Sequence, residues 1–199
     1  MKFSAFLLIA FTSSVTAIGQ VSLGVKGGLN INFYVSVYEI GSKITKQSSS
    51  GVDFHVGGFV KFPLKSKFSF ISELQFSRRG DDVFKLNYLE APMLVSYSPL
   101  RLISIDLGVN AAYLLSFTKP SPFGREDFRK LDFGLTSGLR INFSESFSLI
   151  GRYYFGLTPM LSIDFNQLNS QDPLLINGPS ELNDYSRTVQ FSIAYKIKN

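Results

Sequence analysis

The chain has 199 residues, of which 45% are hydrophobic and 18% charged, with a formal net charge of +5 and no cysteine. This length suits a single domain, and the lack of cysteine excludes a disulfide framework, a thiolate metal site and a lipid-anchoring cysteine. The positive charge is spread along the chain without the basic stripe of a nucleic-acid-binding protein, so no nucleic-acid partner is expected.

The first 19 residues have the pattern of a secretory signal peptide. Lys2 precedes the apolar run FSAFLLIAF, and small residues follow up to Ala17. A positive start, a short apolar core and small residues before the cleavage site are typical of export signals. Cleavage is expected after Ala17 or after Gly19, so that 20–199 forms the mature domain. A buried N-terminal strand or helix is the alternative for this run.

Eight later stretches alternate apolar and polar residues with a period of two, as strands with one apolar face do. In chain order they are 21–33, 52–62, 68–78, 84–97, 103–117, the two arms of a hairpin over 130–157, and 187–197. Strands of globular proteins have about five or six residues, whereas a tilted strand that crosses a bilayer needs about 9–11. No apolar run reaches the roughly 20 residues of a transmembrane helix. These lengths therefore predict membrane-spanning strands.

The hairpin over 130–157 shows the alternation most clearly. Its apolar face consists of Leu131, Phe133, Leu135, Leu139, Ile141, Phe143, Phe147, Leu149, Tyr153, Phe155 and Leu157. The opposite face is polar and carries Arg140 and Arg152. If Phe143 pairs with Phe147 across the turn SES, Gly138 lies opposite Arg152 and leaves room for its long side chain.

The connections alternate between short and long. The short ones are PLKSK, SPLRL and SES, and the longer ones are 34–51, 79–83, 118–129 and 158–186. In an up-and-down antiparallel order, all short turns lie at one end and all long loops at the other. This layout, with an even number of strands, is typical of an outer-membrane barrel.

Aromatic residues near both strand ends suggest the girdles of a membrane barrel. Phe62 and Phe68 flank one short turn, and Tyr34 is expected at the loop end. If Phe62 pairs with Phe68, Gly57 lies opposite Glu73.

The polar faces predict a charged lumen. An eight-stranded barrel is only wide enough to be filled by side chains, and buried ions must be paired because an isolated one is very unfavourable. Asp53 and Lys196 share this face. The expected structural charge network comprises Lys26, His55, Lys61, Glu73, Glu90, Asp106, Asp132, Arg140 and Arg152. The alternative is a soluble sheet with these residues facing solvent.

No catalytic arrangement is evident in the sequence. His55 is the single histidine, and it shares the lumen face with Asp53 and Lys61 rather than the lipid face. The tripeptide DFG at 132–134 lacks the other motifs of a kinase. We therefore expect no enzymatic activity, no cofactor and no metal.

The stretch LNYLEAPMLVSY at 86–97 resembles the NYLEIPLL signature of the PorT-like outer-membrane barrels of Bacteroidota. The segments GVKGGLN at 24–30, KLDFGL at 130–135 and RYYFGL at 152–157 match further recurrent segments in order. The resemblance covers nearly the whole mature chain, with Ala91 in place of a larger aliphatic residue. It implies an outer-membrane location and partners among envelope or secretion proteins. The modest positive charge would in addition suit contact with membrane lipid and lipopolysaccharide.

Together these observations predict an all-β, eight-stranded, antiparallel up-and-down transmembrane barrel with a packed, charged lumen. The expected location is the bacterial outer membrane, with both termini in the periplasm. The expected function is that of a non-enzymatic interaction or assembly component, linked through the resemblance to protein secretion. A narrow solute or ion channel is the alternative.

Overall fold

The computed structural model describes residues 21–40, 43–80, 84–118, 128–164 and 181–198. The predicted signal peptide, 1–19, lies outside these residues. The strands are β1 (Ser22–Ile40), β2 (Lys43–Pro63), β3 (Phe68–Gly80), β4 (Lys85–Tyr97), β5 (Ile103–Thr118), β6 (Leu131–Asn142), β7 (Phe147–Asp164) and β8 (Glu181–Lys198). Within the described ranges, no helix is long and apolar enough to cross a membrane.

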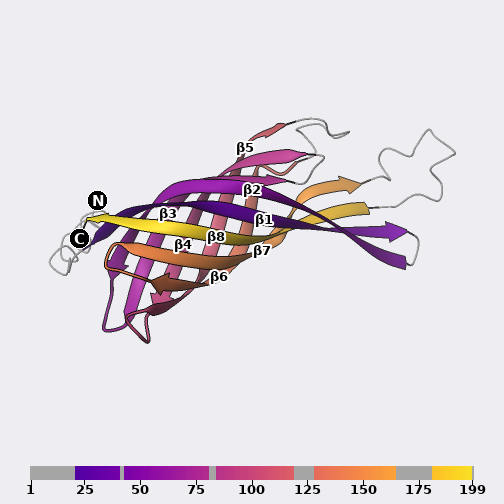
Figure 1. Ribbon diagram of the computed structural model, residues 1–199. Helices are drawn as coiled ribbons and strands as arrows, with labels where there is room; N and C mark the ends of the chain where they lie inside the picture. Colours follow the sequence, from indigo (N-terminus) through magenta and orange to yellow (C-terminus); the bar gives the residue numbers. More distant parts are fainter. Residues whose placement is uncertain (1–20, 41–42, 81–83, 119–127, 165–180, 199) are drawn as a thin grey trace, which may run out of the picture.

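The eight strands close into one barrel in sequence order (Figure 1). Each strand pairs antiparallel with the next, and β8 returns to pair with β1. Closure leaves no open sheet edge around the body of the barrel, which is the condition for a sheet to sit in hydrocarbon. The predicted fold is confirmed.

The apolar faces predicted from the alternation point outward. In the β6–β7 hairpin, Leu135 pairs with Phe155, and these two side chains are 49% and 41% exposed. Arg140 and Arg152, on the other face, are each 3% exposed. Outward apolar side chains and a buried polar interior are the reverse of a soluble barrel and fit a lipid-facing surface.

One predicted strand register is correct and another is wrong. Gly138 lies opposite Arg152, as expected, and Phe143 meets Phe147 across the turn. Phe62, however, pairs with Phe70 rather than with Phe68.

The cause of this two-residue shift is the turn between β2 and β3. The Leu64 N–H donates to the Phe68 carbonyl, which confines the turn to 65–67, with Ser66 in the left-handed region. Gly57 therefore lies opposite Gln75, and Glu73 faces Phe59.

The strands at the loop end are longer than predicted. The adjacent strands β7, β8, β1 and β2 have 18, 18, 19 and 21 residues, whereas β3 to β6 have 12 to 16. Most of the predicted loop 34–51 is thus a paired β-ladder that ends with Ile40 opposite Lys43. We call this tall side of the barrel, formed by β7, β8, β1 and β2, the long wall; Figure 1 shows it projecting past the other strands.

The interior also contains apolar side chains above and below its charged centre. A cluster that includes Leu86, Leu114 and Met160 fills the loop end. A smaller cluster around Ile71 and Ile150 lies toward the short turns.

Tyr34 belongs to the cluster at the loop end, which corrects its expected place in an outer aromatic girdle. Its side chain is 2% exposed and stacks on Phe84, because it follows Asn30 and Asn32 on the inward face of β1.

Candidate functional site

The centre of the lumen is crossed by a chain of five alternating charges. Glu73 of β3 pairs with Lys26 of β1 and accepts two hydrogen bonds of 2.7 Å from the Arg152 guanidinium of β7. Arg152 also contacts Asp106 of β5 at 3.2 Å, and Asp106 pairs with Arg140 of β6 at 3.1 Å. All five residues are at most 3% exposed. The chain ties five of the eight strands together through the lumen.

A second ionic group lies next to the first, toward the loop end. Arg79 contacts Glu90 at 2.7 Å and Asp132 at 3.1 Å. Its guanidinium also stacks over Tyr154, at 4.3 Å from the ring centroid, and the Tyr154 hydroxyl donates to Asp132. Further donors saturate the Glu90 carboxylate, namely the amides of Gln75 and Asn110. This group is a closed cluster of charge and aromatic rings.

Arg79 is the main interior residue that sequence reasoning missed, because it falls in the predicted connection 79–83. The signal was present: Glu73, Gln75 and Ser77 alternate inward along β3, and Arg79 continues their phase. A buried pair of carboxylates, Glu90 and Asp132, also required a cation that the predicted network did not supply nearby.

His55 lies apart from the ion pairs, in a neutral hydrogen-bonded relay. Its Nδ1 lies 2.8 Å from Asn30 Oδ1, and its Nε2 lies 2.7 Å from Ser192 Oγ. Asn30 Oδ1 can only accept, so Nδ1 carries the proton and Nε2 accepts from the Ser192 hydroxyl.

The order hydroxyl, imidazole and orienting amide is that of a nucleophile activated by a base. However, Ser192 is 3% exposed and His55 is 1% exposed. The backbone of Gly28 also packs so closely on Ser192 that an added Cβ would lie 2.7 Å from the Ser192 Cα. The Ser192 hydroxyl is therefore enclosed in the barrel, and the relay holds β1, β2 and β8 together.

Two further lumen-side residues lie nearer the barrel ends. Asp53 sits at the loop end, where Lys85 and Arg78 approach it at 3.1 and 3.6 Å. Lys61 lies at the opposite end, beside Lys196, and lines a cavity there together with Arg140. The structure thus brings Lys26, Glu73, Asp106, Arg140 and Arg152 into one chain, places Glu90 and Asp132 around Arg79, and leaves His55 and Lys61 outside both groups.

The comparison with protein families then decides the class of the chain. A family model described as "Outer membrane protein beta-barrel domain" matches residues 12–162, most of the chain. The chain belongs to this outer-membrane β-barrel family. Its fold, its outward apolar face and its buried charged centre are those of a protein of the bacterial outer membrane, and its surroundings include membrane lipid.

A solved structure of another outer-membrane protein shares the fold, and two further structures align with this chain at lower scores. The outer membrane protein OprG from Pseudomonas aeruginosa aligns with a TM-score of 0.50 and 13% identity, over 89% of this chain and 96% of its own. Neisserial surface protein A aligns with a TM-score of 0.47 at 13% identity, over 89% and 99%. Ail, the attachment invasion locus protein of Yersinia pestis, aligns with a TM-score of 0.41 at 13% identity, over 86% and 98%. No curated protein sequence matches this outer-membrane barrel.

Proposed function

We propose that this outer-membrane barrel is a non-enzymatic interaction or assembly component whose long wall holds a protein partner. The observation that carries the proposal is the length of the four adjacent strands β7, β8, β1 and β2, at 18 to 21 residues. A crossing strand needs only about 9–11 residues, so the wall continues well past the hydrocarbon layer. A paired sheet in that position is a rigid surface for binding.

The long wall also offers a strand edge. In the described part of the chain, β2 pairs with β1 along its full length but with β3 only from His55 onward. Residues 43–54 therefore present one side of their backbone without a strand beside it. Exposed backbone N–H and C=O groups of this kind accept an added strand from a partner. The sequence KITKQSSS at 43–50 is polar, which suits an edge in water.

The lumen supports a role without catalysis or transport. The three cations and two carboxylates of the chain from Lys26 to Arg140, together with Arg79, Glu90 and Asp132, carry equal positive and negative charge. The imidazole of His55 is enclosed in the relay with Ser192. A channel would need a continuous polar path through the same space. The bidentate pair of Glu73 and Arg152 stands across that path.

We further propose that the short turns and both chain ends face the periplasm and the long wall faces outward. The expected signal peptide and the general layout of such barrels, with short periplasmic turns, support this orientation. The resemblance of 86–97 to the PorT-like signature supports a partner that belongs to protein secretion.

A photo-crosslinking residue placed at Ser49, exposed on β2, tests the proposal in cells. We expect adducts with a discrete envelope protein, identified by mass spectrometry, and none from the same residue placed at Lys65 in the opposite turn. A second variant replaces 36–47 by Asn-Gly, a two-residue turn that suits the pair Val35 and Ser48. It should fold but lose the partner.

The interaction would be contradicted if the residue at Ser49 formed no adducts and the shortened barrel still recovered normal amounts of the partner. The secretion link is tested separately in a deletion strain. Normal secretion by that strain, with adducts still formed by the intact barrel, would keep the interaction and remove the link to secretion.

A further inference from the structure

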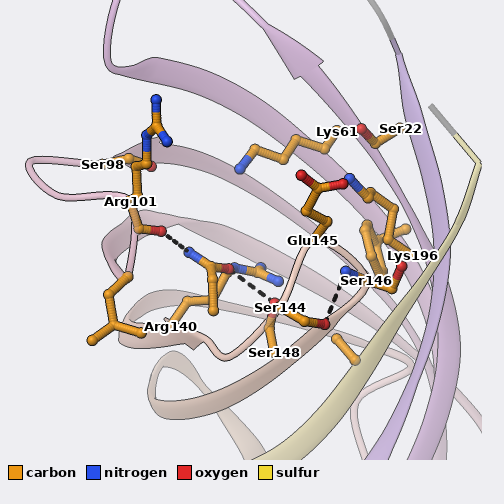
Figure 2. Close-up of a pocket in the computed structure, with 14 residues that line it drawn as sticks. Ser22, Lys61, Ser98, Arg101, Arg140, Ser144, Glu145, Ser146, Ser148 and Lys196 are labelled. Atoms are coloured by element: carbon orange, nitrogen blue, oxygen red, sulfur yellow. Dashed lines mark hydrogen bonds between the residues drawn. The ribbon is translucent and has the colours of Figure 1, made fainter.

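The short-turn end of the barrel, away from the projecting strand ends of the long wall, contains a cavity that the interaction role does not use. It has a volume of about 560 Å³ and lies between the turns 98–102 and 143–146, at the short-turn ends of β2 and β8. This volume lies within the roughly 300–1,000 Å³ typical of small-molecule sites. We call it the short-turn pocket, and Figure 2 shows the side chains that surround it.

The charge around the short-turn pocket is strongly positive. Lys61, Arg101, Arg140 and Lys196 line it, against one carboxylate, Glu145. Figure 2 shows the side chains of Lys61, Lys196 and Glu145 directed into the same space, with Arg101 at the rim. Among the described residues, neither lysine takes part in an ion pair, in contrast to the central network, where every cation is paired.

A buried donor also points to a ligand. Arg140 is 3% exposed and gives its Nη2 to Asp106, but its Nε has no hydrogen-bond partner in the described structure. A buried donor left without a partner is unfavourable by about 1–3 kcal/mol. Arg140 also lines the cationic cavity, so its guanidinium adds a third positive group beside Lys61 and Lys196.

From these observations we propose that the short-turn pocket binds a phosphate group carried on a larger molecule. Two ammonium groups and a guanidinium N–H match the charge of about −1.5 to −2 and the three acceptor oxygens of a phosphomonoester. The hydroxyl-bearing turn residue Ser146 lies beside them, and Phe59 and Ala194 give the pocket an apolar side for the rest of the ligand. The phosphate comes either from a soluble metabolite or from a lipid head group of the adjacent leaflet.

Glu145 provides a test with the opposite sign, because it is the one acidic residue that lines the pocket and it lies on an exposed turn. Its carboxylate opposes a phosphate, so its removal should strengthen binding. The removal of either lysine should weaken binding. Opposite effects from residues within one cavity cannot be produced by a general loss of structure.

Binding is measured by titration calorimetry of the full barrel in zwitterionic micelles, with glycerol 3-phosphate as the soluble probe and glycerol as its uncharged control. We expect Lys61→Gln and Lys196→Gln each to weaken binding of the phosphate about tenfold, the loss of one charge-assisted hydrogen bond. Glu145→Gln should tighten it, and Lys65→Gln, outside the pocket, should leave it unchanged. Heat-dependent electrophoretic mobility shows that each variant is folded.

The lipid source is tested with nanodiscs of phosphatidylcholine that contain a minor share of phosphatidic acid. Native mass spectrometry then counts the phosphatidic acid retained by each variant. If the variants show the expected rank order of binding only with phosphatidic acid, the site binds a lipid head group. If they show it only with glycerol 3-phosphate, the site binds a soluble metabolite. Failure of both probes, or equal losses for Lys61→Gln and Lys65→Gln, would overturn the proposal.

Discussion

At the scale of single residues, Arg152 shows how a barrel lumen can be filled by charge. Its guanidinium satisfies both oxygens of Glu73 at 2.7 Å and reaches Asp106 at 3.2 Å, and its exposed fraction is 3%. The removal of one member of a buried ion pair leaves the other charge without compensation. The removal of any one charge from the network therefore leaves its buried partner unpaired and destabilises the barrel.

The first prediction concerns this residue. Arg152→Leu should lower the free energy of unfolding by about 3–5 kcal/mol. The measurement is denaturant unfolding in detergent micelles. Arg101→Leu, an equivalent change at an exposed arginine without an ion pair in the described structure, should change it by less than about 1 kcal/mol. Equal effects of the two variants would show that the lumen charges do not stabilise the barrel.

The second prediction concerns the lipid-facing surface. Leu135 and Phe143 lie on the same outward face of the β6 arm, but Leu135 is well inside the strand and Phe143 is at its turn. A lysine near the bilayer midplane destabilises a barrel by about 2–4 kcal/mol, and one near the interface by about 0–1 kcal/mol. Leu135→Lys should therefore reduce stability in lipid vesicles far more than Phe143→Lys. A similar loss from both would contradict the position assigned to this face.

At the scale of strands, glycines on the inner face let neighbouring backbones approach closely. At Gly28, in β1, an added Cβ would lie 2.7 Å from the Ser192 Cα of β8. At Gly151, on the outer face of β7, the nearest atom would be the Phe191 ring at 3.9 Å. The strongly curved sheet of a small barrel thus requires glycine inside but not outside.

The third prediction follows from this difference. Gly28→Ala should destabilise the barrel by about 1–3 kcal/mol, because backbone of β8 would have to move. Gly151→Ala should be neutral or stabilise it by up to about 1 kcal/mol, since alanine loses less conformational freedom on folding. Unfolding of both variants under the same conditions measures the contrast. An unchanged free energy of unfolding in Gly28→Ala would mean that β1 and β8 can move apart there without loss of stability.

The strand pattern also shows what can be predicted from sequence. Alternation over 131–143 predicts the outward face and the register of β6 on β7, because lipid and lumen impose opposite polarity on the two faces. The register at the β2–β3 turn cannot be predicted in this way. It depends on a local hydrogen bond from Leu64 to Phe68 that leaves no trace in hydrophobicity.

The positions at which the strands of the long wall end also cannot be predicted from hydrophobicity. Beyond the membrane both faces of a strand contact water, so the alternation fades although the backbone pairing of 34–40 with 43–49 continues. Arg79 was missed for a different reason: it is buried in the lumen, but a strand that ends in Arg78-Arg79-Gly80 looks like a polar loop. The sequence therefore predicts which residues fill the lumen, but only the structure shows which of them form ion pairs with one another.

At the scale of the whole molecule, the lumen is closed at several levels in succession. Apolar clusters around Ile71 and around Leu86 lie on either side of the charge network, and their members are at most 7% exposed. The short-turn pocket therefore ends blindly below the Ile71 cluster. A barrel of eight strands leaves no width for water beside such a filling.

The fourth prediction is that the purified barrel carries no steady ionic current in planar lipid bilayers. An ion would have to separate the Glu73–Arg152 pair and then pass the Arg79 group, and each of these steps uncovers a charge in a medium of low polarity. Glu73→Ala combined with Arg152→Ala removes both charges of the pair and leaves a void; brief, irregular openings from this variant alone would locate the barrier at that pair. A steady, ion-selective current through the unmodified barrel that disappears in Glu73→Gln would instead establish the channel, because only a conducting path lined by that carboxylate would respond in this way.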